Sequence, residues 1–157
     1  YKYPRALDFP GAGFTAGPCL FKDTMQLSAF SNNTFAIGNS AMMINEWLPL
    51  YLVERLGRKF ELSSLKVGIL GMAFKGESDD NRSSLAYKLK RILKFKVEQV
   101  LTCDPYVTVD KDLLDQDFVV ENSDLLIIAS PHLRYKEIVT DKPIIDIWNL
   151  RGNGSLV

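Results

Sequence analysis

The sequence predicts an α/β fold in which a central helical segment is followed by a doubly wound, Rossmann-like parallel sheet domain. Two observations lead to this prediction. Short apolar runs rich in β-branched residues alternate with helical stretches over residues 65–148, as in sheets whose parallel strands are connected by helices. Residues 22–56 instead carry apolar side chains at three- and four-residue spacing, which is typical of helices. We therefore expect one unit at residues 1–60 and a second at residues 61–157.

The first unit begins with an extended lead-in, residues 1–10, which contains two prolines. A helical stretch follows from about residue 22 to residue 56, and the SNNT segment at 31–34 is expected to divide it, because Ser and Asn favour turns and caps. Pro49 falls inside the second helix, and Gly57 is expected just beyond its end. This second helix is apolar over a broad stripe, so it packs either against another subunit or within its own domain.

The second unit contains four apolar runs that predict strands, at residues 65–70, 99–104, 124–130 and 143–148. A further short strand is predicted at 117–120, and helices are predicted at 83–95 and 132–139. Ligands of doubly wound sheets bind beyond the carboxyl ends of the strands. The loop at residues 71–84 is therefore expected at a ligand crevice.

The composition is that of a globular chain, with 46% apolar residues, 24% charged residues and no net charge. A neutral chain has no basic surface to attract a polyanion, so we expect no nucleic-acid partner. No apolar run approaches the roughly 18 residues of a membrane span, so no membrane partner is expected. Two cysteines are too few for a disulfide framework and fit a reducing cytoplasm. Because the first residue is Tyr1, we expect a longer parent protein.

A glycine-rich loop and its continuation, GAGFTAGPCLFKD at residues 11–23, bring a cysteine and two charged residues close together. Cys19 is expected where the loop enters a helix, and there the free amides and the helix dipole favour a thiolate. Lys22 adds positive charge. Asp23 follows four residues after Cys19, on the same helix face, where it can orient a water or accept a proton. The alternative is that Cys19 is a small buried hydrophobe, as most free cysteines are.

The loop at residues 71–84, GMAFKGESDDNRSS, lacks a dinucleotide-binding GxGxxG pattern, since only Gly71 and Gly76 are present. A dinucleotide-binding domain at residues 65–150 is therefore a disfavoured alternative. Lys75 and Arg82 are cations that can meet phosphates or carboxylates, and Phe74 lies beside them. The two aspartates at 79 and 80 are expected to cap the following helix.

AGPCLFKD and ILGMAFKGESDDNRSS resemble two signatures of the UDP-glucose/GDP-mannose dehydrogenase family, roughly G-G-x-C-x-x-K-D and G-x-A-F-K-x-x-T-D-D-x-R-x-S. NEWLP at 45–49, CDP at 103–105 and DIWN at 146–149 follow in the family's order. Ala16 replaces a glycine of many members, and Ser78 replaces a common threonine. The resemblance covers nearly the whole chain. It implies the C-terminal half of such an enzyme, without the family's N-terminal NAD-binding domain.

The resemblance implies an NAD-dependent enzyme that oxidises the C6 alcohol of a nucleotide sugar to the uronate in two steps, through a thioester on Cys19. UDP is favoured over GDP by family frequency. Asp23 would orient the hydrolytic water, and Lys22 would supply positive potential near the cofactor. A homodimer would form through the central helix. The alternative is a non-catalytic module that binds nucleotide sugars and dimerises; the isolated chain is expected to be inactive.

The resemblance also implies substrate-binding and cofactor-binding residues. The expected substrate-binding residues are Gly11, Gly13, Phe14, Phe74, Lys75, Asn149 and Arg151. Arg82 would reach NAD, and no metal is expected. Among residues outside these motifs, His132 is expected to be a cap or an exposed side chain, and Cys103 to be part of the core.

Overall fold

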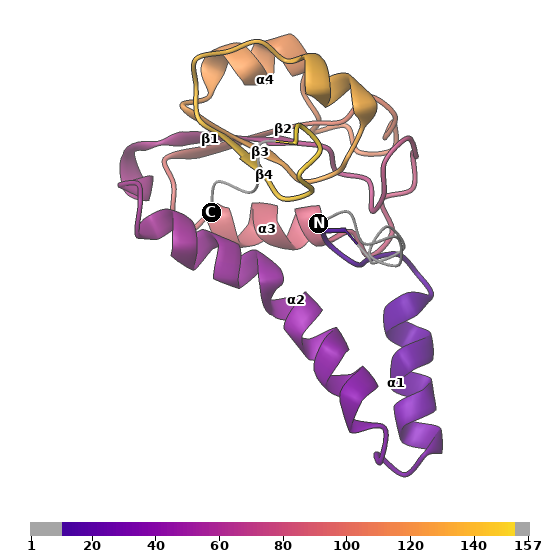
Figure 1. The fold of residues 1–157 in the computed structure, drawn as a ribbon. Helices are drawn as coiled ribbons and strands as arrows, with labels where there is room; N and C mark the ends of the chain where they lie inside the picture. The colour runs from indigo at the N-terminus through magenta and orange to yellow at the C-terminus, as the bar shows by residue number, and fades with distance from the viewer. Residues whose placement is uncertain (1–10, 153–157) are drawn as a thin grey trace.

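The computed structural model describes residues 11–152, so the predicted lead-in at 1–10 lies outside the described residues. A helical hairpin leads into a four-stranded parallel sheet with helices on both faces (Figure 1). The predicted α/β class is confirmed. None of the helices within the described range is long and apolar enough to cross a membrane.

The hairpin consists of α1, Leu20–Phe30, and α2, Ala36–Gly57, and it extends away from the sheet (Figure 1). Asn32 and Asn33 adopt left-handed φ angles of 50° and 61° between the helices, a conformation that asparagine tolerates. The predicted break at SNNT is therefore confirmed. Gly57 is the last residue of α2 and does not follow its end, so that prediction is wrong. The helix end is closed by the amides of residues 58–60, which donate to carbonyls of residues 55 and 56 without a left-handed glycine.

The sheet has the strand order β2-β1-β3-β4, and every neighbouring pair is parallel. Its strands are β1, Lys66–Leu70, β2, Gln99–Cys103, β3, Leu125–Ile128, and β4, Ile144–Asp146. A 3-10 turn, η2, Leu62–Ser64, connects α2 to β1. Helix α3, Leu85–Leu93, covers one face and α4, Gln116–Asn122, covers the other (Figure 1). The strand order reverses between β1 and β3, so the loops that leave these two strands border the predicted ligand crevice.

Residues 117–120 form part of α4, so the strand predicted there is wrong. Asp115 explains the helix, because its Oδ1 accepts the amides of Asp117 and Phe118 over 2.8 and 3.3 Å and so caps the first turn. The helix predicted at 132–139 is a short 3-10 helix, η3, Leu133–Glu137.

The larger apolar core runs from α2 through α3 into the sheet. Its buried members include Leu52, Val53 and Leu56 of α2, Leu85, Leu89 and Leu93 of α3, and Val67, Ile69, Leu125, Ile127 and Ile145 of the strands. A second cluster fills the space between the sheet, α4 and η3. The C-terminal half of α2 is therefore packed on the sheet domain, and the hairpin tip is not.

Candidate active site

The cysteine loop, residues 11–19, is attached to α2 by the side-chain amide of the buried Asn45. Asn45 accepts the backbone N–H of Thr15 at Oδ1 over 2.9 Å, and its Nδ2 donates to the carbonyl of the same residue. Both polar groups of Thr15's backbone are thus bound by one side chain. Phe14, a predicted substrate-binding residue, is 6% exposed and packs in the larger core.

Two glycines of this loop lie against aromatic rings from distant parts of the chain. Gly13 has a φ of 142° and faces the ring of Trp148 so closely that no Cβ would fit. Gly17 has a φ of 106°, and a Cβ there would come within 3.0 Å of the Phe74 ring. The cysteine loop therefore meets both the loop after β1 and the segment after β4.

Cys19 is exposed and occupies the N-cap position of α1, so it is not the buried hydrophobe of the alternative interpretation. Its carbonyl accepts the amide of Asp23 over 2.8 Å. Lys22 Nζ lies 3.0 Å from Asp23 Oδ1, and both side chains are exposed. The hydrogen bond and charge of Asp23 raise the pKa of Lys22, and Cys19 contributes in the same direction. The three predicted catalytic residues thus share the first turn of α1.

Arg82 lies within electrostatic range of Cys19 and is fixed by Asp80. Its Nε and Nη2 bind the two Asp80 carboxylate oxygens at 3.0 and 2.7 Å. These bonds, with one from the Arg82 amide, lower the pKa of Asp80 to about 2. Asp80 and, to a smaller extent, Cys19 raise the pKa of Arg82. The structure thus pairs the exposed Arg82 guanidinium with Asp80, and Cys19 adds a smaller electrostatic contribution in the same direction.

The predicted capping of α3 by Asp79 and Asp80 is wrong. Ser84 is the N-cap, and its Oγ accepts the amide of Ala86 over 3.3 Å. The loop makes one more turn before the helix, with Ser83 at a left-handed φ of 55°, so the two aspartates lie too early in the chain to reach the helix amides.

Phe74 and Lys75 form the tip of the loop that leaves β1. Lys75 is exposed, and its Nζ lies 5.5 Å from the centroid of the Phe74 ring. The start of the loop is bound by Asp104, whose Oδ2 accepts the amides of Met72 and Ala73 over 2.6 and 2.9 Å. The loop tip therefore follows a rigid backbone anchor.

Asp104 is a charged group in a buried place, since its side chain has no exposed surface. Burial raises its pKa, but hydrogen bonds from His132, Tyr106, Met72 and Ala73 outweigh burial and lower the pKa to about 2. The carboxylate therefore remains ionised and keeps accepting hydrogen bonds at neutral pH.

The segment after β4 is organised by Asp146. Its Oδ1 accepts the amide of Trp148 over 3.1 Å and its Oδ2 accepts the amide of Arg151 over 2.8 Å. Trp148 Nε1 in turn donates to the carbonyl of Ala129 over 3.0 Å, which fixes the ring that meets the cysteine loop. Asn149 is exposed at a left-handed φ of 53°. Arg151 Nη1 is buried without a hydrogen-bond partner among residues 11–152.

Two hollows border the cysteine loop. The first, of about 250 Å³, is apolar and is lined by Ala12, Gly13, Phe14, Leu48, Tyr51, Leu52 and Ile147. The second, of about 230 Å³, is lined by Thr15, Ala16, Gly17, Phe21, Glu46, Ser83, Ser84, Leu85, Lys88 and Arg91. Gly13 and Phe14 are the predicted site residues that line either hollow. Gly11 is exposed in open space.

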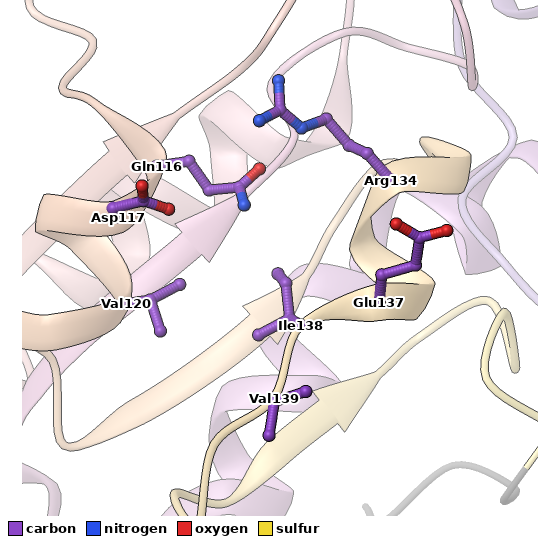
Figure 2. A pocket seen from close by; sticks show the side chains of 7 residues that line it. All are labelled: Gln116, Asp117, Val120, Arg134, Glu137, Ile138 and Val139. Atoms are coloured by element: carbon purple, nitrogen blue, oxygen red, sulfur yellow. The ribbon is translucent and has the colours of Figure 1, made fainter.

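A third hollow, of about 350 Å³, lies between α4 and η3. Figure 2 shows Gln116 and Asp117 on α4, and Arg134 and Glu137 on η3. Its lining carries charges of both signs and includes no predicted site residue. Within the described part of the chain, no group of three His, Cys, Asp or Glu side chains could hold a metal ion.

Sequence reasoning missed four residues that shape the site. Asn45, Asp104 and Trp148 lie within NEWLP, CDP and DIWN, so their positions were marked but their roles were not. His132 does occupy the N-cap position of η3, as one of its two predictions states, although its side chain makes no cap bond. The alternative of an exposed side chain is wrong, because the ring has no exposed surface and bonds to both Asp104 and the loop after β1. No periodicity signals such a histidine, since its partners are far away in the chain. Cys103 is 2% exposed, which confirms its place in the core.

Comparison with known proteins identifies relatives along most of the chain. UDP-N-acetyl-D-mannosamine dehydrogenase of Pyrococcus horikoshii is 34% identical over 142 residues, which is 87% of this chain and 33% of the relative. UDP-glucose 6-dehydrogenase of Rickettsia felis is 28% identical over 93% of this chain and 38% of the relative. The chain thus spans about a third of the length of the curated relatives it matches.

Solved structures show the same similarity. A UDP-D-ManNAc dehydrogenase from Pyrococcus horikoshii superposes with a TM-score of 0.78 at 31% identity, over 94% of this chain and 38% of the other. A UDP-glucose dehydrogenase from Pyrobaculum islandicum gives 0.76 at 26% identity, over 90% and 36%. Residues 68–153 match the model of the UDP-glucose/GDP-mannose dehydrogenase family, UDP binding domain. The chain therefore belongs to the UDP-glucose/GDP-mannose dehydrogenase family.

Proposed function

We propose that this chain is the C-terminal part of an NAD-dependent dehydrogenase that oxidises the C6 alcohol of a UDP-sugar to the uronate, with Cys19 as the covalent nucleophile. One observation carries the proposal. Cys19 is exposed at the start of α1, beside Lys22 and Asp23 and within electrostatic range of Arg82. An exposed sulfur at a helix start, with Lys22 beside it, is accessible to a carbonyl carbon and lies near a cation that can offset the negative charge that develops there.

The proposed chemistry passes through the cysteine sulfur. The alcohol first loses a hydride and a proton to become an aldehyde, and the thiolate then adds to its carbonyl carbon. This adduct is a tetrahedral alkoxide, and loss of a second hydride from it gives a thioester. Water attacks the thioester carbon, the C–S bond breaks, and the carboxylate leaves as the thiolate returns, while the two protons of the water pass to solvent. Each oxidation passes its hydride to NAD when that cofactor is bound.

Asp23 is the proposed orienting group for the hydrolytic water. It lies one helical turn from Cys19, and its backbone N–H is bonded to the Cys19 carbonyl. Its carboxylate is paired with Lys22 at an exposed position, so a water can approach it. Lys22 supplies positive potential for the thiolate and for the oxygen on which negative charge develops.

The nucleotide sugar is proposed to bind across the loops after β1 and β4. Lys75 is an exposed cation suited to the diphosphate, and Phe74 offers an aromatic face. Arg151 has a buried, unpartnered Nη1 in the described residues, which suits an anionic oxygen. Backbone groups of residues 11–14 and the exposed Asn149 complete the proposed pocket.

The turn after β1 does not fit a dinucleotide. Its amides at Met72 and Ala73 already donate to Asp104, and the amide of Glu77 donates to His132. A pyrophosphate would need such amides free. This argues against the dinucleotide-binding alternative for residues 65–150. We propose that NAD is bound chiefly by a further domain, towards which Arg82 and Lys22 direct positive charge.

The test is the full-length enzyme with Cys19→Ser, assayed for NADH and uronate on a panel that includes UDP-glucose and UDP-N-acetyl-D-mannosamine. We expect uronate formation to fall by roughly 10³-fold or more, because no thioester can form. Cys103→Ser is the matched control, since that cysteine is buried in the core. Uronate formation at the wild-type rate in the Cys19→Ser enzyme would sink the proposal. The isolated chain is expected to form no NADH.

A second candidate function, a module that binds nucleotide sugars and dimerises, is favoured by the apolar surface of α2. Ile37, Ile44 and Trp47 share a helix face and are 83%, 61% and 60% exposed. We expect the chain to sediment as a homodimer and Trp47→Glu to make it monomeric. Val139→Asp, at a 95% exposed position after η3, should leave the dimer intact. Calorimetry with UDP-sugars tests binding by the isolated chain.

A further inference from the structure

Residues 130–133, which we call the β3 exit segment, lie alongside the loop after β1, and successive residues of the two segments are in contact. Three successive contacts join the two segments: Ser130 Oγ to the carbonyl of Lys75, the carbonyl of Pro131 against Gly76, and His132 Nδ1 to the amide of Glu77. The first and third are hydrogen bonds of 3.1 and 2.9 Å. A Cβ on Gly76 would come within 2.6 Å of the Pro131 oxygen, so the two backbones are in direct contact.

The proton of the His132 ring is fixed by its partners. A backbone N–H can only donate, so Nδ1, which faces the amide of Glu77, must be an acceptor without a proton. Nε2 therefore carries the proton and donates to Asp104 Oδ2 over 3.1 Å. The ring is fully buried between Tyr106 and Tyr135, whose ring centroids lie 5.0 and 5.5 Å away. Neither nitrogen can turn to another partner without leaving this packing.

His132 and Asp104 together enclose the tip of the loop. Asp104 binds the amides that precede the tip, at Met72 and Ala73, and His132 binds the amide that follows it, at Glu77. The bond between imidazole and carboxylate connects the two anchors. Phe74 and Lys75 thus lie in a short segment whose backbone is hydrogen-bonded to buried side chains on both sides.

Glu77 needs such support because its backbone is strained. Its φ of 53° is in the left-handed region, which is unfavourable for a residue with a Cβ. Its carboxylate adds two more bonds, accepting the Leu133 amide over 2.7 Å and the Tyr106 hydroxyl over 2.6 Å. If His132 Nδ1 did not accept its hydrogen bond, the Glu77 amide would have no partner at this buried position.

We propose that His132 is a positioning residue that presents Phe74 and Lys75 to the nucleotide sugar by accepting the Glu77 amide; this rests on the proposed function of the loop. It touches neither substrate nor reacting atoms. Its contribution lies in keeping the loop in its binding-competent shape before the ligand arrives, which lowers the ordering cost of binding.

Two conservative variants of the full-length protein separate the contacts of the ring. His132→Asn places an amide oxygen near Nδ1 and can still accept the Glu77 amide. His132→Gln places an amide nitrogen near Nε2 and can donate to Asp104, but it leaves the Glu77 amide unpaired. Both variants lose the ring packing, and each keeps one of the two bonds of the ring, so their difference compares the Glu77 bond with the Asp104 bond. UDP binding by calorimetry, hydrogen exchange of residues 74–77 and thermal unfolding are measured for each.

We expect His132→Gln to weaken UDP binding by roughly tenfold and to speed exchange at residues 74–77, whereas His132→Asn stays within about threefold of wild type. In turnover, the KM for the UDP-sugar should rise more than kcat falls. If the two variants bind UDP with the same affinity, whether that affinity equals the wild-type value or lies below it, the positioning role is overturned. Absence of UDP binding by the wild type counts against the proposed function instead, and the exchange comparison still decides whether His132 holds the loop.

A spectroscopic measurement keeps the inference testable if the glutamine variant does not fold. In wild-type protein labelled with ¹⁵N-histidine, the His132 ring must show an unprotonated Nδ1 and a protonated Nε2. The opposite tautomer would mean that Nδ1 cannot accept the Glu77 amide, and the proposed role would be lost.

Discussion

Single polar side chains carry much of the site's geometry at the residue scale. Asp104 accepts five hydrogen bonds, from the amides of Met72, Ala73, Tyr106 and Val107 and from His132 Nε2. Asn45 likewise binds an amide of the loop that precedes α1, and Asp146 binds two amides of the segment that follows its own strand. Each of these side chains replaces backbone pairing that an irregular loop cannot supply.

Asp104 makes stability depend on pH in a defined window. Its pKa is about 2 in the folded chain and near 3.8 in the unfolded chain, so the ionised form is stabilised by folding. This contributes about 2 kcal/mol above pH 4 and is lost as the pH falls towards 2. We expect Asp104→Asn to destabilise the protein at pH 7 by a similar or larger amount. The difference from wild type in urea unfolding should shrink between pH 4 and pH 2; a constant difference would contradict this account.

Asn45→Ala tests the attachment of the cysteine loop. The variant removes both bonds between the Asn45 side chain and the Thr15 backbone, at a cost of about 1–3 kcal/mol for the two bonds together. We expect hydrogen exchange at residues 15–19 to accelerate before exchange in the sheet does. Asn39→Ala, in the same helix, is the matched control. Slow exchange at Thr15 in the Asn45→Ala protein would show that the loop is held by other contacts.

Helix termini and turns decide the assignments at the element scale. The apolar run within residues 117–120 suits a strand, yet the segment is helical. Asp115 caps the helix, and α4 must cover the sheet face opposite α3. The tertiary requirement thus outweighs the local preference of Val119 and Val120. A cap and a sheet face to cover are the features that distinguish the two structures.

Asp115→Ala should destabilise α4 by about 1 kcal/mol, because the amides of Asp117 and Phe118 lose their acceptor. Asp115→Asn retains an acceptor oxygen and should recover most of the loss. Chemical unfolding of the two variants measures the difference. Equal stability of the alanine and asparagine variants would show that the cap does not determine the helix.

At the scale of the whole molecule, one apolar core spans the boundary that the sequence predicts between its two units near residue 60. Leu56 of α2 is fully buried in the cluster that contains the strands β1 and β3. Lys88 of α3 adds a bond to the carbonyl of Glu46 and a 3.1 Å ion pair with its carboxylate. The base of the hairpin and the sheet are therefore expected to unfold together.

Leu56→Ala should lower the stability of both parts by about 3 kcal/mol. The fluorescence of Trp47 on α2 reports on the hairpin, and that of Trp148 after β4 reports on the sheet domain. Trp148→Phe leaves Trp47 as the single tryptophan, and Trp47→Phe leaves Trp148. We expect the two fluorescence transitions to coincide and to shift together in Leu56→Ala. Leu133→Ala, at a side chain that is 56% exposed, should shift neither. Separate transitions would mean that residues 1–60 form an independent domain.

The sequence predicted the sheet and its crevice because buried strands and helix faces have periodic patterns. It also predicted Cys19 at a helix start and the two loops that meet there. It could not predict His132, Asn45 or Trp148 as parts of the site. The contacts of His132 and Asn45 span 55 and 30 residues, Trp148 meets Gly13 near the other end of the described chain, and no pattern records such pairs. The capping assignment of Asp79 and Asp80 failed for a related reason, since an extra turn at Ser83 moves the helix start.

The contact between Gly13 and Trp148 has a consequence for biosynthesis. Gly13 emerges from the ribosome well before Trp148, so the cysteine loop cannot make this contact until the segment after β4 has been synthesised. Contacts between such distant residues form late in folding. A polypeptide that stops before β4 would keep the nucleophile but lose the ring against which its loop is built. The packing of the loop that carries Cys19 therefore depends on a segment made more than a hundred residues later, roughly the span from Gly13 to Trp148.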